Sequence, residues 1–221
     1  TYDRSPYGND GTLVRMNEGN QTDNNSWAPG KYGYGMKFDG GDDYVAVNGL
    51  LTQLAQDTVG SIEFWSKLKG DNELSTMPFA MTNYGSGTRT DFVLQYTMSD
   101  DSFKFHVMVD ITYSWIGETV DDSMDQYVGK WLHVAVTQDG VEPKLYFNGV
   151  EQGVTFTTST DKTKWFKAVL TDATTDADSA QLGGWRWNGG EGNFFNGTLD
   201  EFKIYSRVLA PEEIRTHYLR G

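Results

Sequence analysis

The sequence of 221 residues contains no cysteine, so disulfide bonds, thiolate nucleophiles and zinc sites built from thiolates are all excluded. It has no apolar run long enough to cross a bilayer, and we expect no membrane insertion. Basic residues are also scarce: 18 Lys and Arg stand against 31 Asp and Glu, which gives a formal net charge of −13. Nucleic acids, anionic membranes and polyanionic glycans are therefore disfavoured as partners.

Helical periodicity is nearly absent as well. An aromatic content of 14% and 25 glycines are typical of many short strands joined by tight turns. The length predicts one domain spanning residues 1–221. Alternation of apolar and polar residues predicts strands at 12–14, 36–38, 44–47, 61–68, 79–81, 92–96, 103–109, 113–118, 131–137, 144–147 and 150–156, and a short helix at 50–56. The long polar region 157–180 is predicted to be functional, mobile or partly structured.

The last predicted strand is 199–205, which follows a tight turn at 196–197. Its two adjacent carboxylates, Asp200 and Glu201, point to opposite faces, so at most one can face the apolar core. Pro211 then stands in a first-helical-turn position with two glutamates after it, which predicts a short C-terminal helix.

Residues 195–205 resemble the closing strand of the laminin G-like, concanavalin A-like jelly-roll superfamily, in which the pattern Phe-x-Gly-x-Ile-Asp-Glu-x-x-Ile-Tyr is frequent. Residues 30–45, and residues 130–137 followed by 145–149, are similar to two further stretches of that family in the expected order. The resemblance implies an all-β, two-sheet antiparallel jelly-roll sandwich with a short C-terminal helix. The same fold hosts lectins, hydrolases, lyases, adhesion modules and structural domains, so it does not by itself define a function.

Members of this superfamily usually have one more strand before the stretch that begins this sequence. Its absence predicts an N-terminal sheet edge with unpaired backbone groups, unless the chain is trimmed or the sandwich starts one strand late. A protein partner, or a second copy of the chain, is therefore expected to be able to cover this edge.

Three carboxylates, Asp39, Asp42 and Asp43, lie in one Gly-rich turn. Calcium takes about six to eight oxygen ligands and mixes carboxylates with backbone carbonyls, and such a turn supplies both. The resemblance implies a structural calcium near the first and last strands, so the predicted metal ligands are Asp39, Asp43 and Asp200. The alternative is that these carboxylates cap the turn through its own backbone amides.

Two loops combine aromatic rings with polar side chains, as a sugar site requires. Sugars present flat C–H faces to aromatic rings, and their hydroxyls need polar partners such as Asp, Asn and Arg. The predicted sugar-binding residues are Trp185, Arg186, Trp187, Asn188 and Asn193 in one loop and Tyr84, Arg89 and Asp91 in the other. The alternative is that the two tryptophans form one face of a core strand and leave Arg186 exposed.

Catalytic signals are weak. Glycoside hydrolysis needs two facing carboxylates, but Glu63 stands alone on its strand, and Asp200 and Glu201 diverge. The Glu-x-Asp-x-x-Glu pattern of related glucanases is absent. Polysaccharide lyases of the resembled fold use Arg, Gln, His and Tyr on a concave sheet. Of the three histidines only His106 could face such a groove, and a hydrogen-bonded strand histidine is the favoured interpretation of it. We therefore predict no catalytic residue.

The leading hypothesis is a non-catalytic carbohydrate-binding or adhesion domain of a secreted, surface or viral protein, with a glycan or polysaccharide as its partner and a calcium ion fixing turn geometry. The alternative is a structural or assembly module without sugar affinity, such as a particle decoration domain, and an enzyme ranks third. The resemblance places all of these outside the cell, on the cell surface or on a virion. Exposure of Trp185 and Trp187 beside a groove distinguishes the first two hypotheses.

Overall fold

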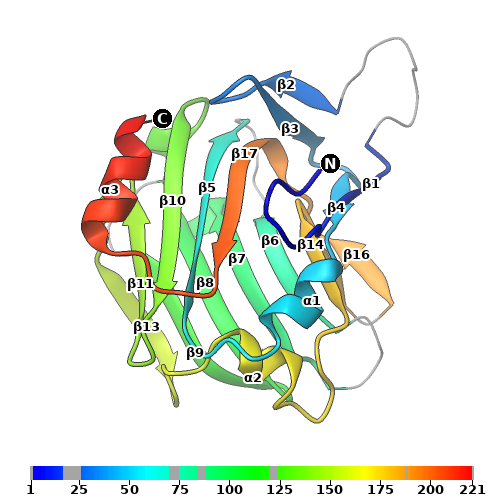
Figure 1. Cartoon of the computed structure of the whole chain (residues 1–221), viewed down its shortest axis with the longest axis vertical. Helices are drawn as coiled ribbons and strands as arrows, with labels where there is room; N and C mark the ends of the chain where they lie inside the picture. Colours follow the sequence, from blue (N-terminus) through cyan, green and yellow to red (C-terminus); the bar gives the residue numbers. More distant parts are fainter. Residues whose placement is uncertain are drawn as a thin grey trace.

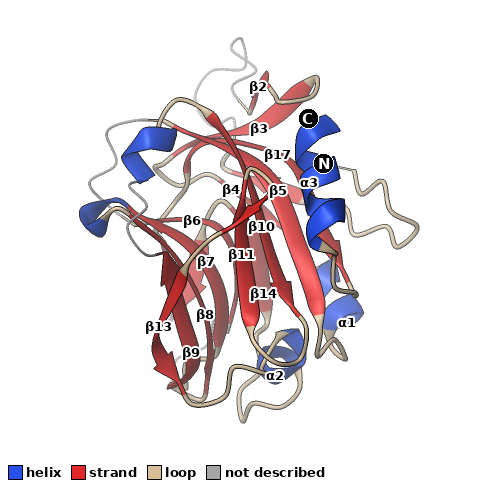
Figure 2. Cartoon of the chain, turned by 90° about the vertical axis from the view of Figure 1, so that its left-hand side faces the viewer, coloured by secondary structure: helices blue, strands red, loops and turns tan. Residues whose placement is uncertain are grey.

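Two antiparallel sheets pack face to face in the described part of the chain (Figure 1). The structure is a computed structural model and describes residues 2–16, 26–69, 75–83, 88–119, 124–187 and 189–220, without the side chain of Trp187. Figure 2 shows the two sheets side by side, with helix α3 (Pro211–Arg220) on the outer side of one of them. The predicted all-β sandwich with a C-terminal helix is confirmed.

The first sheet, within the described residues, has eight strands in the order β1-β4-β14-β6-β7-β8-β9-β13. Strands β7, β8 and β9 follow one another along the chain as antiparallel neighbours, so they form a continuous surface. The strands of this sheet are β1 (Thr12–Val14), β4 (Tyr44–Ala46), β14 (Ser179–Leu182), β6 (Thr76–Thr82), β7 (Asp91–Thr97), β8 (Ser102–Val109), β9 (Thr112–Thr119) and β13 (Val154–Ser159).

The second sheet has seven strands over the same described ranges, in the order β12-β11-β10-β5-β17-β3-β2. They are β12 (Val150–Glu151), β11 (Pro143–Phe147), β10 (Trp131–Gln138), β5 (Gly60–Leu68), β17 (Asn196–Tyr205), β3 (Tyr34–Asp39) and β2 (Trp27–Pro29). A separate hairpin pairs β15 (Trp185–Trp187) with β16 (Gly190–Gly192).

The described helices are short. Helix α1 (Gly49–Leu54) lies where the sequence predicts one, and α2 (Phe166–Leu170) lies inside the long polar region. Single 3₁₀ turns occur at Met98–Asp100 and Met124–Tyr127. None of the helices in the described ranges combines the length and the apolar character that a membrane span needs.

The core lies between the sheets because apolar residues alternate with polar ones along most strands. On β5, Ile62 and Phe64 are fully buried between the sheets, while Glu63 and Trp65 point to the outer face beneath α3. Helix α2 closes one end of the core, and Trp165, which precedes it, is 1% exposed. Both outer faces therefore carry polar residues on a rigid apolar base.

Strand β17 bulges at the two carboxylates that the sequence singles out. Asp200 and Lys203 pair with positions only two residues apart on β5, so the strand carries one extra residue there. Glu201 adopts a left-handed φ of 50°, while the Phe202 ring turns inward and stacks on Phe64 with centroids 5.8 Å apart. The bulge therefore keeps both carboxylates outside the core.

Candidate functional site

The outer face of the eight-stranded sheet carries polar side chains along β7, β8 and β9. In β8 the two phenylalanines and Val107 point into the core, so the intervening Lys104 and His106 point outward. The strand pairing places Gln95 of β7 and Glu118 of β9 on either side of Lys104. These residues form the floor of a polar surface.

A cavity of about 380 Å³ lies over this floor. Its walls come from the loop before β7 and from the β15–β16 hairpin, which are distant in sequence. The residues that line it are Met77, Arg89, Gln95, Lys104, His106, Tyr113, Ile116, Glu118, Thr157, Trp185 and Asn193. The two loops that the sequence selects thus meet at one cavity.

Trp185 forms one wall of the cavity. Its ring packs on Met77, Ala80 and Val93, a small apolar cluster on the outer face of the sheet. The guanidinium carbon of Arg89 lies 5.1 Å from the ring centroid, a cation–π arrangement. Trp185 is half-buried at the cavity edge, so it does not belong to a core strand.

Asp91 is buried beneath the cavity and holds two of the side chains that line it, Arg89 and His106. Its Oδ1 lies 2.8 Å from Nε2 of His106, and its Oδ2 accepts a hydrogen bond from Nε of Arg89. Burial opposes ionisation, but the charges and hydrogen bonds of His106 and Arg89 outweigh it and lower the pKa of Asp91. Since Asp91 is 0% exposed, it positions other residues and cannot itself contact a sugar.

The remaining predicted sugar-binding residues divide into three groups. Asn193 lines the cavity and accepts a hydrogen bond from the backbone N–H of Met77 at 2.9 Å. Arg186 lies on the other side of the hairpin from Trp185, where its Nε is 3.5 Å from Oε1 of Glu191, so it is not part of the cavity. Tyr84, Asn188 and the side chain of Trp187 lie outside the described residues.

Gln95, Lys104 and Tyr113 were not among the residues predicted from the sequence, which indicated only that His106 could face a groove. The signal was the alternation of Phe with polar residues in β8, which places Lys104 and His106 on the face opposite the core. Alternation along a strand predicts to which face of the sheet each side chain points, but it does not predict which part of that face other segments leave uncovered. That depends on the β15–β16 hairpin, which covers part of the sheet.

The predicted metal ligands do not all meet. One oxygen from each of Asp39, Asp42 and Asp43 lies within 4.8 Å of the others. The pairing of β17 with β3 sets Asn196 opposite Asp39, which leaves Asp200 four residues further along the strand. Grouping Asp200 with Asp39 and Asp43 is therefore not supported, because the strand carries it away from the turn.

Asp200 has a local structural role instead. Its carboxylate accepts hydrogen bonds from the backbone N–H of Tyr32 at 2.8 Å and of Glu201 at 2.9 Å. The first contact holds the loop before β3 against the outer face of the seven-stranded sheet. The second stabilises the bulge in β17.

The acidic turn has the donor set that a hard cation prefers. Burial and repulsion from the neighbouring Asp39 carboxylate raise the pKa of Asp43 to about 6. Turn amides also bind them: the N–H of Gly41 donates to Asp39 at 2.7 Å, and the N–H of Asp39 donates to Asp43 at 3.1 Å. Both the cation and the turn-capping interpretations thus have structural support.

A comparison with known families matches residues 39–215 to the concanavalin A-like lectin/glucanases superfamily. The chain belongs to this superfamily. A comparison with curated proteins gave no match.

Solved structures with the same fold include carbohydrate-binding modules. The chain resembles the IT-sialidase CBM40 of Ruminococcus gnavus, with a TM-score of 0.66 and 18% identity over 83% of this chain and 95% of that chain. It also resembles domain 4 of AbnA, a GH43 extracellular arabinanase from Geobacillus stearothermophilus, in complex with arabinotriose, with a TM-score of 0.60 and 20% identity over 95% of this chain and 88% of that chain.

The receptor binding domain of botulinum neurotoxin mosaic serotype C/D shares the fold as well. The TM-score is 0.65 at 17% identity, and the match covers all of this chain and 48% of the toxin chain. At these identities the likeness establishes the fold, and the ligands in these structures belong to those proteins.

Proposed function

We propose that this protein is a non-catalytic carbohydrate-binding domain that holds a glycan on the outer face of the eight-stranded sheet. One observation carries the proposal: Arg89, Trp185 and Asn193, selected from the sequence as sugar ligands, line one cavity together. Similarity to carbohydrate-binding modules, one of them bound to α2,3-sialyllactose, supports the same function.

The cavity offers both kinds of contact that a sugar requires. Trp185 and Tyr113 supply apolar ring surface, and Tyr113 stands edge-on to His106 with centroids 5.1 Å apart. Gln95 and Asn193 add amide groups that can donate to and accept from hydroxyls. The rigid sheet below keeps these groups in place without a ligand, which lowers the entropy cost of binding.

A glycan-array screen of the purified domain tests the proposal, run once with excess calcium and once with a chelator. Replacement of Trp185 by Ala should weaken binding by about tenfold or more, because a stacked ring contributes on the order of 1–2 kcal/mol. Trp27→Ala is the matched control, since Trp27 is 37% exposed on the edge strand of the other sheet. Absence of binding to every glycan under both conditions would reject the proposal.

We also propose that the turn of Asp39, Asp42 and Asp43 binds calcium and stabilises the start of the domain. The mutual repulsion of three close carboxylates supports this, because a divalent cation relieves it. Calcium should raise the melting temperature of the wild type and leave Asp42→Asn/Asp43→Asn nearly unchanged. An equal response of both proteins would show that calcium acts elsewhere.

A specific observation favours a second candidate function, β-elimination of a polysaccharide that contains uronic acids. Arg89, Gln95, His106 and Tyr113 line one cavity, and they are the residue types that lyases of this fold use. Arg89 and Gln95 would bind the uronate carboxylate. One of His106 and Tyr113 would take the C5 proton and the other would protonate the departing C4 oxygen, as the C4–O bond breaks and a C4=C5 double bond forms. The net charge of −13 counts against a polyanionic substrate.

Incubation with alginate and with polygalacturonate separates this candidate from simple binding. A lyase releases an unsaturated sugar whose ultraviolet absorbance increases with time, and His106→Ala should abolish the increase. Glycan binding without any such product would leave the non-catalytic function in place.

The assembly module remains the alternative if no glycan binds. In the described residues, the strands at the N-terminal side of both sheets, β1 and β2, have three residues each and offer few backbone groups to a partner strand. We propose an extracellular setting, on a cell or virion surface, for either function. The extracellular arabinanase and the toxin domain with the same fold support that setting.

A further inference from the structure

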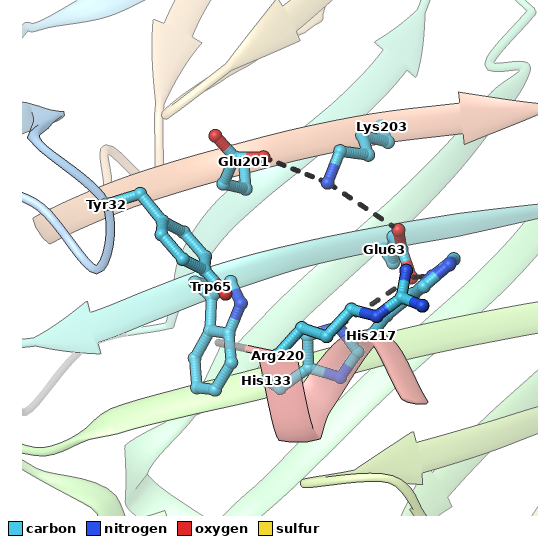
Figure 3. Close-up of a pocket in the computed structure, with 8 residues that line it drawn as sticks. All are labelled: Tyr32, Glu63, Trp65, His133, Glu201, Lys203, His217 and Arg220. Carbon is cyan, nitrogen blue, oxygen red and sulfur yellow. Dashed lines mark hydrogen bonds and ion pairs between the residues drawn. The ribbon is translucent and has the colours of Figure 1, made fainter. Parts of the chain in front are cut away.

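A second cavity, of about 410 Å³, lies on the opposite side of the sandwich (Figure 3). Its floor is the outer face of the seven-stranded sheet, formed by residues of β5, β10 and β17. Helix α3 and the loop before β3 form its walls. His133 and His217 were not predicted to lie at a cavity, yet both line this one, because the strand and the helix that carry them meet only in the folded chain.

Glu63 is buried in the floor and is compensated within the protein. Its Oε1 accepts a hydrogen bond from the hydroxyl of Tyr205 at 2.7 Å, and its Oε2 accepts one from Nδ1 of His217 at 2.8 Å. Nε2 of His133 lies 3.7 Å from the same Oε2. The described side chains around Glu63 do not bring three metal-ligating atoms within 4.8 Å of one another, so this arrangement does not fit a metal site.

Two fixed cations, Lys203 and Arg220, line the cavity beside two carboxylates, Glu63 and Glu201, and the carboxylates pair with Lys203 rather than with Arg220. Nζ of Lys203 lies 2.9 Å from Oε2 of Glu201, and Nζ of Lys31 lies 4.2 Å from the centroid of the Trp65 ring. Arg220 lines the cavity, and no hydrogen bond or ion pair joins it to another described residue. A guanidinium in that state can take a carboxylate through two parallel hydrogen bonds.

The cavity also has an aromatic side. Figure 3 shows Tyr32 and Trp65 on one side, and Lys203, Glu63 and the guanidinium of Arg220 on the other. Tyr32 is 42% exposed and offers its ring, whereas Trp65 is almost fully covered. A sugar ring that carries an acidic group has an apolar face that fits the aromatic side of the cavity and a negative charge that fits the cationic side. The cavity volume is within the range of small-ligand pockets.

We propose that this cavity is a second binding site, independent of the first, for a single carboxylate-bearing monosaccharide such as a uronic acid. The carboxylate lies between Arg220 and Lys203, and the ring lies against Tyr32. The acidic surface disfavours long polyanions, but a single carboxylate beside Arg220 is attracted mainly by that guanidinium, because the lining carboxylates pair with Lys203.

Histidine-ring NMR tests the proposal, because the protein has only three histidines and they report on different sites. His133 and His217 line this cavity, and His106 lines the other one. Titration with glucuronate and with galacturonate should shift the signals of His133 and His217 and leave His106 unchanged. A shift of His106 alone would assign the uronate to the first cavity and overturn the proposal, whatever glycan the first cavity binds.

Variants and matched ligands complete the experiment. Arg220→Gln should weaken uronate binding by about tenfold or more, because it removes a charge-assisted contact. Arg215→Gln changes an exposed arginine on the same helix outside the cavity and should leave the affinity unchanged. Glucose should bind at least about tenfold more weakly than glucuronate. Equal affinity for acetate, equal effects of both variants, or no binding of either uronate would overturn the proposal.

Discussion

At the scale of single residues, Glu63 connects three separate parts of the fold. It lies on β5 and contacts Tyr205 of β17, His217 of α3 and His133 of β10. Burial raises its pKa, but the interactions with His133, His217 and Tyr205 outweigh this and lower the pKa to about 2. Glu63 is therefore a point at which the terminal helix is held to the sheet.

Acid should weaken the protein through Glu63. The unfolded chain has its ordinary pKa of 4.5, so the ionised carboxylate contributes its full stability above pH 4.5 and loses it as the pH falls toward 2. The shift corresponds to about 3 kcal/mol. We expect Glu63→Gln to lower the free energy of unfolding at pH 7 by about 2–4 kcal/mol and to lose less stability than the wild type between pH 7 and about pH 3.

Urea denaturation at the two pH values measures both effects. Glu142→Gln serves as the control, because Glu142 is a surface residue that pairs only with Lys162 among the described side chains. Parallel loss of stability in the wild type and in Glu63→Gln would show that other carboxylates cause the acid sensitivity.

The sequence could not predict these contacts. It indicated that Glu63 is the only carboxylate on its strand, which is correct. It did not indicate that side chains from other elements contact Glu63 in the folded protein. The hydrogen-bond partners Tyr205 and His217 lie 142 and 154 residues away in the chain. Alternation along β5 places Glu63 on the outer face, but its partners come from β17 and α3, which reach it only in the folded chain.

At the scale of elements, the turn between β8 and β9 is strained. Asp110 and Ile111 both have left-handed φ angles, 49° and 61°, and a β-branched residue rarely adopts this conformation. Ile111 is 67% exposed and gains little from burial. We expect Ile111→Gly to raise the free energy of unfolding by about 1 kcal/mol, because glycine removes the steric cost.

Thermal unfolding of Ile111→Gly beside Val141→Gly measures this effect. Val141 is also an exposed β-branched residue in a turn, but its φ is not positive. The control should therefore be neutral or destabilising, because glycine only adds freedom to the unfolded chain there. A lower melting temperature for Ile111→Gly would contradict the strain argument.

Sequence patterns predicted most strands of the two large sheets, but they missed β14 and α2. Strands β5, β7 and β8 were predicted because apolar residues recur with a period of two. All four residues of β14 are buried, so the strand shows no alternation of exposed and buried positions, and its first half was assigned to the polar region 157–180. Helix α2 has five residues, too few to show a helical period.

At the scale of the whole molecule, the excess of acidic groups should make stability depend on salt. A net charge of −13 repels itself at low ionic strength, and added salt screens this repulsion. We expect the melting temperature at pH 7 to rise with sodium chloride when a chelator removes calcium. Near the isoelectric point of about 4.5 the effect of salt on the melting temperature should become small. A melting temperature that falls with added salt at pH 7 would mean that ion pairs outweigh the repulsion.

Family resemblance in a few motifs was sufficient to predict the sandwich, whereas the site could be predicted only in part. Arg89, Trp185 and Asn193 were selected because their loops combine rings with polar groups. Gln95 and Tyr113 come from strands, where only the folded sheet shows that their outer face stays open. Asp200 was misplaced because the register of β17, which separates it from the acidic turn, cannot be read from the motif.

The β15–β16 hairpin has a consequence for diversification. Its strands pair with neither large sheet, and its base is fixed by backbone hydrogen bonds from Gly183 to Pro78 and from Phe195 to Gly183, each 3.0 Å long. The segment between these two hydrogen-bonded positions contributes Trp185 and Asn193 to the cavity, and most of the other lining residues belong to the sheet. An exchange of residues 185–193 for a loop of another sequence should therefore reshape ligand preference while the sandwich folds unaltered, which makes this hairpin a natural cassette for engineering new specificities.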